Sequence, residues 1–516
     1  MSTSDQPGSV PPEAPAPPWW LKLASPARKP LRAPSPAEGW WGLLPLAVGL
    51  LLYLPPTLAS GWALDDWMLI AQHPHATDGS WIGEWTQPTY LAAGDHSSFV
   101  WRPLVATLWR WLGWAVGLRP AVFHLLSLGL HLTNLRILQR VIRLWALRLG
   151  YSAGPAAAIL ALGWTLHPAT PDVVGWVSST FELGATLGVL MALRAGLRTE
   201  MVFPWIFVAL LCKESALPAV VGVPLLAGLV TEARRRIWIE ALGAGLLWWI
   251  LHRLVTGSGG QYPAEGWIAW LQLLGAGWAP LRASMSHLFD PEASVQPGML
   301  LLVVGLLCLG VRGLRPLGLG GLVGAWMLLP AGFGVALIGI APLRYLYLPL
   351  AMVLVPLGAL PLRKMLLGGA GILLGLAWGP RAASRADEWR DEESLWQGEL
   401  LMEAGNPVAV RQWVRYRWEH GEPERRPELL TTWKVAIDRM PRTVQWFNPV
   451  DERFQLAQAA FIVGNFPLAQ EQVSLYLLSR PDAPPKAWCL LADSLEHGGG
   501  GAHEVDLADR RCKAAP

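Results

Sequence analysis

Charged side chains are scarce in this chain of 516 residues: Asp, Glu, Lys and Arg make up 15% of it, whereas hydrophobic residues make up 53%. The net charge is only +3, with arginines scattered between apolar segments, so we expect no nucleic-acid partner. Four cysteines are too few for a disulfide framework. Cys212 and Cys308 fall in apolar segments, while Cys489 and Cys512 either pair or stay free. Such a composition predicts a polytopic membrane protein.

Eleven apolar runs that are long enough, or nearly long enough, to cross a bilayer recur up to about residue 380. They are residues 40–59, 121–142, 153–166, 179–193, 201–211, 216–230, 237–251, 298–311, 317–340, 345–360 and 365–379. Several are shorter than the roughly 20 residues of a perpendicular span, which is consistent with tilted or packed helices. We therefore expect an all-α bundle of about 11 spans over residues 39–380.

Basic residues fall in every second loop, which predicts the orientation because short cytoplasmic loops concentrate Lys and Arg. The alternation holds if the N-terminus is cytoplasmic and the apolar stretch 103–116, which is rich in Trp and Arg, lies on the outer interface without spanning. The first outer loop, residues 60–120, is then extracytoplasmic. An odd number of spans places residues 381–516 on that same side.

The two ends of the chain differ in composition from the apolar part. Residues 1–38 are rich in Pro, Ser and Ala and predict a disordered cytoplasmic tail. Residues 381–516 are polar with helical periodicity and predict a soluble helical domain. Within residues 454–481, the positions of Leu456, Ala460, Gly464, Ala469 and Pro481 fit a tetratricopeptide unit, and a shift of 34 residues predicts a partial second unit. An ordinary array of helical hairpins explains this spacing equally well.

Two adjacent carboxylates, Asp65 and Asp66, follow the first apolar run. Because charge is costly beside a bilayer, such a pair is a candidate functional site. The alternative is that one aspartate caps an interfacial helix, for which a single aspartate is enough.

Further motifs follow this pair in a fixed order. They are Trp101-Arg102-Pro103-Leu104, Phe123-His124-Leu125 with His131-Leu132-Thr133-Asn134, His167-Pro168 with Phe181-Glu182-Leu183, Lys213-Glu214-Ser215-Ala216, and Arg344-Tyr345-Leu346-Tyr347-Leu348-Pro349. With Leu64-Asp65-Asp66, their order over residues 40–380 resembles the GT-C superfamily of polyprenyl-phosphate-sugar-dependent glycosyltransferases. It is most similar to protein O-mannosyltransferase-like membrane proteins with extracytoplasmic tetratricopeptide repeats. One departure is Thr180, where the repeat-bearing members of that family lead us to expect Arg.

The resemblance implies roles for residues in these motifs. The first acidic residue is usually the base or acceptor-orienting group, so we expect Asp65 to act as base with Asp66 assisting. A donor phosphate needs cations at the outer ends of spans, and the candidates are Lys213, Arg253 and Arg344. Snorkelling of Arg344 to the interface, or an ion pair of Lys213 with Glu214 or Glu182, is the alternative. The candidates for supporting the site or the acceptor are Arg102, His167, Glu182, Glu214 and Tyr345.

These patterns favour an integral-membrane glycosyltransferase that moves a sugar from a polyprenyl-phosphate donor to an extracytoplasmic protein or glycan hydroxyl. Metal dependence stays open, because some members of the resembled superfamily use a divalent ion and others do not. The spacing of the acidic and histidine residues is not a recognised metal signature, so we assign no metal and no other cofactor. A lipid-glycan transporter and a non-catalytic scaffold that presents helical repeats are the alternatives. Arginine outnumbers lysine and Ala, Gly, Leu and Trp are abundant, which suggests a bacterial plasma membrane. In a eukaryotic cell the same topology would place the site and the repeats in the lumen of the endoplasmic reticulum.

Overall fold

The described part of the protein is mainly helical in the computed structural model, as the sequence predicts for its all-α class. The structure describes residues 41–92, 100–151, 154–257, 285–286, 302–311, 314–330, 341–359, 364–402, 407–439, 449–480 and 482–513. The only strands in these ranges are β1 (Met285–Ser286) and β2 (Ala341–Pro342), two residues each. They pair antiparallel, with Met285 opposite Pro342.

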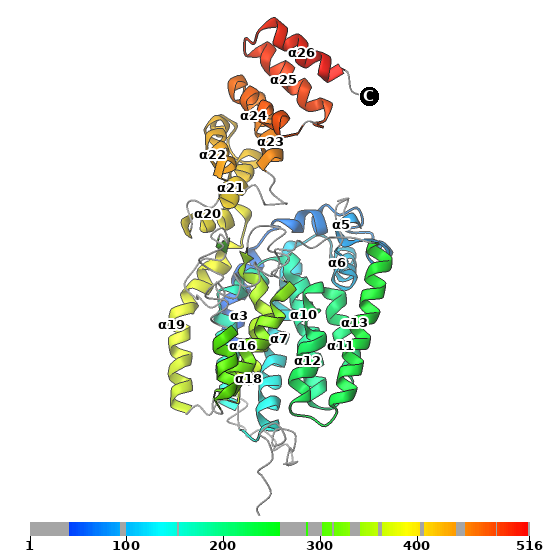
Figure 1. Ribbon diagram of the computed structural model, residues 1–516. Coiled ribbons are helices and arrows are strands. Elements are labelled where there is room, and N and C mark those ends of the chain that lie inside the picture. Colours follow the sequence, from blue (N-terminus) through cyan, green and yellow to red (C-terminus); the bar gives the residue numbers. More distant parts are fainter. Residues whose placement is uncertain are drawn as a thin grey trace, which may run out of the picture.

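The first part of the chain forms a bundle of helices that lie roughly side by side (Figure 1). Its elements are α3 (Leu44–Ala59), η1 (Trp67–Ala71), α4 (Ile82–Thr86), α5 (Thr89–Ala92), α6 (Pro103–Val116), α7 (Pro120–Arg148), α8 (Gly154–Leu166), α9 (Ala169–Val174), η2 (Val177–Ser179), α10 (Thr180–Leu197), α11 (Phe203–Cys212), η3 (Glu214–Ala216), α12 (Ala219–Gly228), α13 (Arg234–Thr256), α16 (Arg315–Met327), η4 (Leu343–Leu346), α18 (Tyr347–Leu357) and α19 (Lys364–Glu388). Residues 302–310 are also helical.

Helix α10 lies at the centre of the bundle and contacts α7, α11 and α12. Glycines make its close approach to α11 possible. A Cβ at Gly188 would lie 2.7 Å from the Cβ of Ala209, and one at Gly184 would lie 2.9 Å from the Sγ of Cys212. Small residues of this kind let two helix backbones approach closely.

Two of the described helical segments are long and apolar enough to cross a membrane, by length and composition alone: Pro120–Arg148 and Val177–Leu197, each with a mean hydropathy of 1.3. Shorter apolar helices at Leu44–Ala59, Gly154–Leu166, Phe203–Cys212, Glu214–Gly228 and Arg344–Leu357 accompany them. A buried core helix of a soluble protein passes the same test, so the bundle of about 11 spans stays a prediction. Within the described ranges, each of the 11 apolar runs overlaps a helix, but residues 40, 153, 298–301, 331–340 and 360 of these runs lie outside them.

Helix α6 has the bounds expected for the interfacial stretch, Pro103–Val116, and it is two-sided. Val105, Trp109 and Arg110 are buried against the bundle, whereas Trp111 and Trp114 are 49% and 66% exposed. The aromatic residues that crowd this stretch thus divide between core and surface.

A helical array follows the bundle and extends from the bundle end that carries α5 (Figure 1). Its elements are α20 (Glu392–Met402), α21 (Pro407–His420), η5 (Pro423–Arg425), α22 (Arg426–Arg439), α23 (Pro449–Ile462), α24 (Phe466–Ser479), α25 (Pro485–His497) and α26 (Ala502–Lys513). Neighbours in sequence pack on one another, most closely α23 on α24 and α25 on α26. The predicted division at residues 380 and 381 falls within α19, which continues to Glu388. The predicted tail at residues 1–38, and Pro481 of the repeat spacing, lie outside the described residues.

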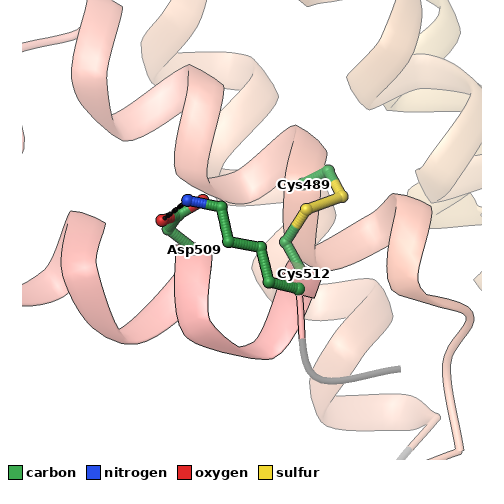
Figure 2. Close-up of a disulfide and its surroundings, with 4 residues drawn as sticks. Cys489, Asp509 and Cys512 are labelled. Carbon is green, nitrogen blue, oxygen red and sulfur yellow. Dashed lines mark hydrogen bonds and ion pairs between the residues drawn. A yellow bond between two sulfur atoms is a disulfide. The ribbon is translucent and has the colours of Figure 1, made fainter. Parts of the chain in front are cut away.

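A disulfide joins Cys489 of α25 to Cys512 of α26, which decides between the two alternatives left open by the sequence (Figure 2). Cys212 and Cys308 are free and buried in the bundle. The covalent link therefore lies in the last helix pair of the array.

Candidate functional site

The segment between α3 and η1, residues 60–66, carries the acidic pair and adopts an unusual backbone. Leu64 has φ +54°, in the left-handed region that non-glycine residues seldom occupy. Two distant hydrogen bonds hold the segment: the Gly61 N–H donates to the carbonyl oxygen of Arg390 at 2.9 Å, and the Leu64 N–H donates to Oε1 of Glu392 at 2.6 Å. The chain that leaves the bundle thus fixes the backbone on which Asp65 is mounted.

The Asp65 carboxylate accepts a hydrogen bond at Oδ2 from the hydroxyl of Tyr90, at 3.0 Å. Its side chain stays partly accessible. Burial raises the pKa of Asp65 above its usual value, and it outweighs the Tyr90 hydrogen bond and the nearby Arg344 and Arg102 charges, which lower this pKa. A raised pKa and an open face are properties that suit a general base.

The Asp66 carboxylate differs from that of Asp65, because it is fully buried and both of its oxygens accept hydrogen bonds from the protein. Oδ1 accepts hydrogen bonds from the backbone N–H and the hydroxyl of Ser178, at 2.7 and 2.6 Å, and Oδ2 accepts one from the Ala63 N–H at 3.2 Å. Burial raises the pKa of Asp66 to about 7, despite these donors. Asp66 precedes η1 without capping it through its side chain. It fastens the 60–66 segment to η2, and no contact of its carboxylate points to a direct part in chemistry.

Arg102 and Arg344 lie close enough to act on the charge of Asp65, and Lys213 lies beside Tyr345. Arg102 and Lys213 have other carboxylates as partners. Arg102 makes a paired contact with Glu214, in which its Nε donates at 2.9 Å and a second guanidinium nitrogen also bonds. The Nζ of Lys213 lies 2.6 Å from Oε2 of Glu182, so the ion-pair alternative describes its geometry. These pairs neutralise Arg102 and Lys213.

Arg344 is the third cation; its charge acts on Asp65, and among the described residues no carboxylate forms a close ion pair with it. Its guanidinium lies over the ring of Trp176, at 4.2 Å from the centroid, and 5.4 Å from the ring centroid of Tyr345. The Tyr345 ring also lies 5.2 Å from the Nζ of Lys213 and interacts electrostatically with Arg102. Tyr345 therefore connects the three cations.

Two predicted residues lie away from this cluster. His167 is buried against Trp378 of α19, with ring centroids 5.1 Å apart, and its Nδ1 accepts from the Ala169 N–H. Arg253 is exposed at the end of α13, where it lies over the ring of Trp249. Neither contact joins these side chains to Asp65.

A buried network supports the site from the side of α19. Asp172 accepts at Oδ1 from the Nε of Arg385, at 2.6 Å, and from the indole N–H of Trp389, at 2.9 Å. The Trp389 ring stacks on Trp176, with centroids 5.9 Å apart, and the Trp176 indole donates to the Ala63 carbonyl. Arg344 and the 60–66 segment thus share one aromatic support.

Sequence reasoning missed Tyr90, Ser178, Trp176 and Glu392. Tyr90 could have been found from the sequence, because it is a hydroxyl-bearing residue in the same predicted outer loop as the acidic pair. The other three act through contacts with residues far away in the chain.

Among the described residues, no three His, Cys, Asp or Glu side chains come together in a way that could hold a metal ion. Comparisons of the chain with protein-family models, with curated proteins and with solved structures find no match.

Proposed function

We propose that this protein is an integral-membrane glycosyltransferase that moves a sugar from a polyprenyl-phosphate donor to a hydroxyl of an extracytoplasmic protein or glycan. The observation that carries the proposal is the grouping of Asp65, Tyr90 and Arg344, which come from three distant parts of the chain. Such a reaction needs a carboxylate that takes the acceptor proton and a cation that holds the departing phosphate. This cluster supplies both groups side by side.

In the proposed reaction, Asp65 accepts the proton of the acceptor hydroxyl while that oxygen bonds to the anomeric carbon of the sugar. The bond between this carbon and the phosphate oxygen breaks, and the polyprenyl phosphate leaves with the electron pair. Arg344 holds the departing phosphate through its fork of donors. Arg102 and Lys213 are neutralised by Glu214 and Glu182, so we assign them to shaping the site. The reaction as written invokes no metal.

The proposed location is a bacterial plasma membrane, with several spans, a cytoplasmic N-terminus and an extracytoplasmic array. Lipid-linked donors require a site at a membrane edge, and α20 and α5 lie at the same end of the bundle (Figure 1). The Cys489–Cys512 disulfide supports an oxidising compartment for the array, because disulfides persist outside the reducing cytosol.

For the array, we propose tetratricopeptide-like helix pairs that capture the acceptor protein. Leu456, Ala460 and Ala469 are fully buried between α23 and α24, as the small-residue spacing predicts. Gly464 turns the chain with φ +78°, and Asn465 caps α24 by accepting from the Leu468 N–H. These contacts equally describe a plain helical hairpin, so the repeat assignment rests on the sequence spacing.

The test is transfer from a radiolabelled polyprenyl-phosphate sugar in membranes that contain the full-length chain. Asp65→Asn preserves shape but removes the base, and we expect transfer to fall by about 10²–10⁴-fold. Asp78→Asn is the matched control, because Asp78 is an exposed aspartate of the same loop. Transfer that persists in Asp65→Asn would refute the assigned base. Wild-type membranes that show no transfer above membranes lacking the chain would favour the transporter or the scaffold.

A further inference from the structure

A groove of about 540 Å³ runs between α3 and α7 at the surface of the bundle. Its lining is apolar along α3 and mixed along α7. The lining residues are Leu43, Leu46, Ala47, Leu50, Leu132, Thr133, Arg136, Ile137 and Arg140. No acidic side chain lines it.

The polarity of the groove changes along its length. A Cβ at Gly49 would lie 3.3 Å from Leu132, which fixes the level at which α3 and α7 meet. From there α7 continues by eight residues to Arg140, about 12 Å along the helix axis. The groove is thus apolar near Leu132 and cationic near Arg140. Helix α3 begins at the cationic end of the groove and ends at Ala59, directly before the 60–66 segment. The cationic end therefore lies away from that segment.

The two arginines at that end are poised for an anion. Arg136 and Arg140 are one turn apart on the same helix face. Arg136 donates to Oε1 of Gln139, and neither arginine has a carboxylate partner among the described residues. Two guanidinium groups of like charge, placed side by side, favour a bound anion such as a phosphate.

We propose that this groove binds an anionic phospholipid of the cytoplasmic leaflet, with its phosphate on Arg136 and Arg140 and an acyl chain along Leu46, Leu50 and Leu132. This proposal rests on the proposed membrane embedding and not on the transfer reaction. The order of cationic end and apolar end matches a phospholipid that stands in that leaflet. The sugar carrier is less suited, because its phosphate must reach Asp65 at the opposite end.

The experiment is native mass spectrometry of the detergent-purified full chain, titrated separately with phosphatidylglycerol, phosphatidylcholine and undecaprenyl phosphate. Retention of the chain in membranes after an alkaline wash is measured first, so that a failure of membrane embedding is recognised separately. Arg136→Gln/Arg140→Gln removes the phosphate contacts, and Ala47→Trp fills the groove while it keeps both charges. Arg234→Gln/Arg235→Gln is the control, because it removes two exposed charges at the start of α13.

We expect wild type and the control to bind phosphatidylglycerol about tenfold more tightly than phosphatidylcholine, a difference of about 1.4 kcal/mol that two arginines near an anionic headgroup are able to supply. The double glutamine variant loses this preference, and Ala47→Trp loses the bound lipid. Undiminished phosphatidylglycerol binding in either variant overturns the site. Equal binding of phosphatidylcholine, or tighter binding of undecaprenyl phosphate, overturns the assigned occupant.

Discussion

The backbone N–H of Leu64 donates a hydrogen bond to Oε1 of Glu392, although 328 positions separate the two residues. Leu64 directly precedes the proposed base, and its left-handed backbone needs external support. Glu392 therefore acts as a positioning residue for Asp65 within the proposed function.

Replacement of Glu392 tests this role. Glu392→Ala removes the acceptor, and we expect kcat to fall about 10- to 100-fold with the KM for the donor little changed, which corresponds to one hydrogen bond to a charged group. Glu392→Gln keeps an acceptor oxygen and is expected to retain most of the activity. Steady-state rates of sugar transfer measure both variants. If the glutamine variant fails as badly as the alanine variant, the hydrogen bond is not what matters.

The two aspartates should respond differently to mutation. Asp66→Ala leaves the backbone N–H groups of Ala63 and Ser178 without partners, and we expect a loss of about 3 kcal/mol of stability. Asp65→Asn leaves the fold intact, because its side chain is partly accessible and its contact with Tyr90 survives. Thermal unfolding in detergent, followed by tryptophan fluorescence, compares them. An equal drop in Tm for both variants would contradict the assignment of a structural role to Asp66 and a chemical role to Asp65.

The pH dependence of transfer should report Asp65. The carboxylate is the active form of a base, so kcat/KM rises as the pH rises through the pKa of Asp65. Arg344 lowers this pKa, so the pKa of Asp65 rises in Arg344→Gln. The acid limb of the pH profile, which is the range where kcat/KM rises with pH, then moves to higher pH.

Tyr90→Phe should move the acid limb in the same direction, because the Tyr90 hydrogen bond also stabilises the carboxylate. It should leave the donor KM near that of wild type, whereas Arg344→Gln should raise it. Arg253→Gln is the matched arginine control, and its limb should stay in place. A limb that moves to lower pH in Arg344→Gln would be incompatible with Asp65 as the base.

The disulfide should stabilise only the end of the array. Cys489→Ser/Cys512→Ser is expected to cost about 3 kcal/mol of local stability, as for a loop of this size. Limited proteolysis should then cut within residues 482–513 while the bundle stays intact. Rapid cleavage between bundle helices in this variant would mean that the disulfide also stabilises the bundle.

The sequence predicts local features of this protein well and distant contacts poorly. The bounds of α6 and the burial of Leu456 and Ala460 follow from periodicity, which depends on near neighbours. That Asp65, Arg102 and Arg344 lie close together is predicted only by the order of the motifs along the chain, through their resemblance to a known family. The role of Asp66 does not follow at all, because its carboxylate gives the same sequence signal whether it meets Ser178 or a substrate. The ion pair of Lys213 with Glu182 was one of two alternatives, since spacing does not identify a partner 31 residues away.

The network around Asp172 sets an order of events during synthesis. Arg385 and Trp389, which donate to Oδ1 of this buried carboxylate, are translated 213 and 217 residues after it. Until they arrive, the nascent bundle holds an uncompensated charge beside the 60–66 segment, which destabilises it. A polypeptide released before residue 389 of the 516 would therefore expose an unfinished interior to chaperones and proteases, and the bundle is completed only after most of the chain has been made.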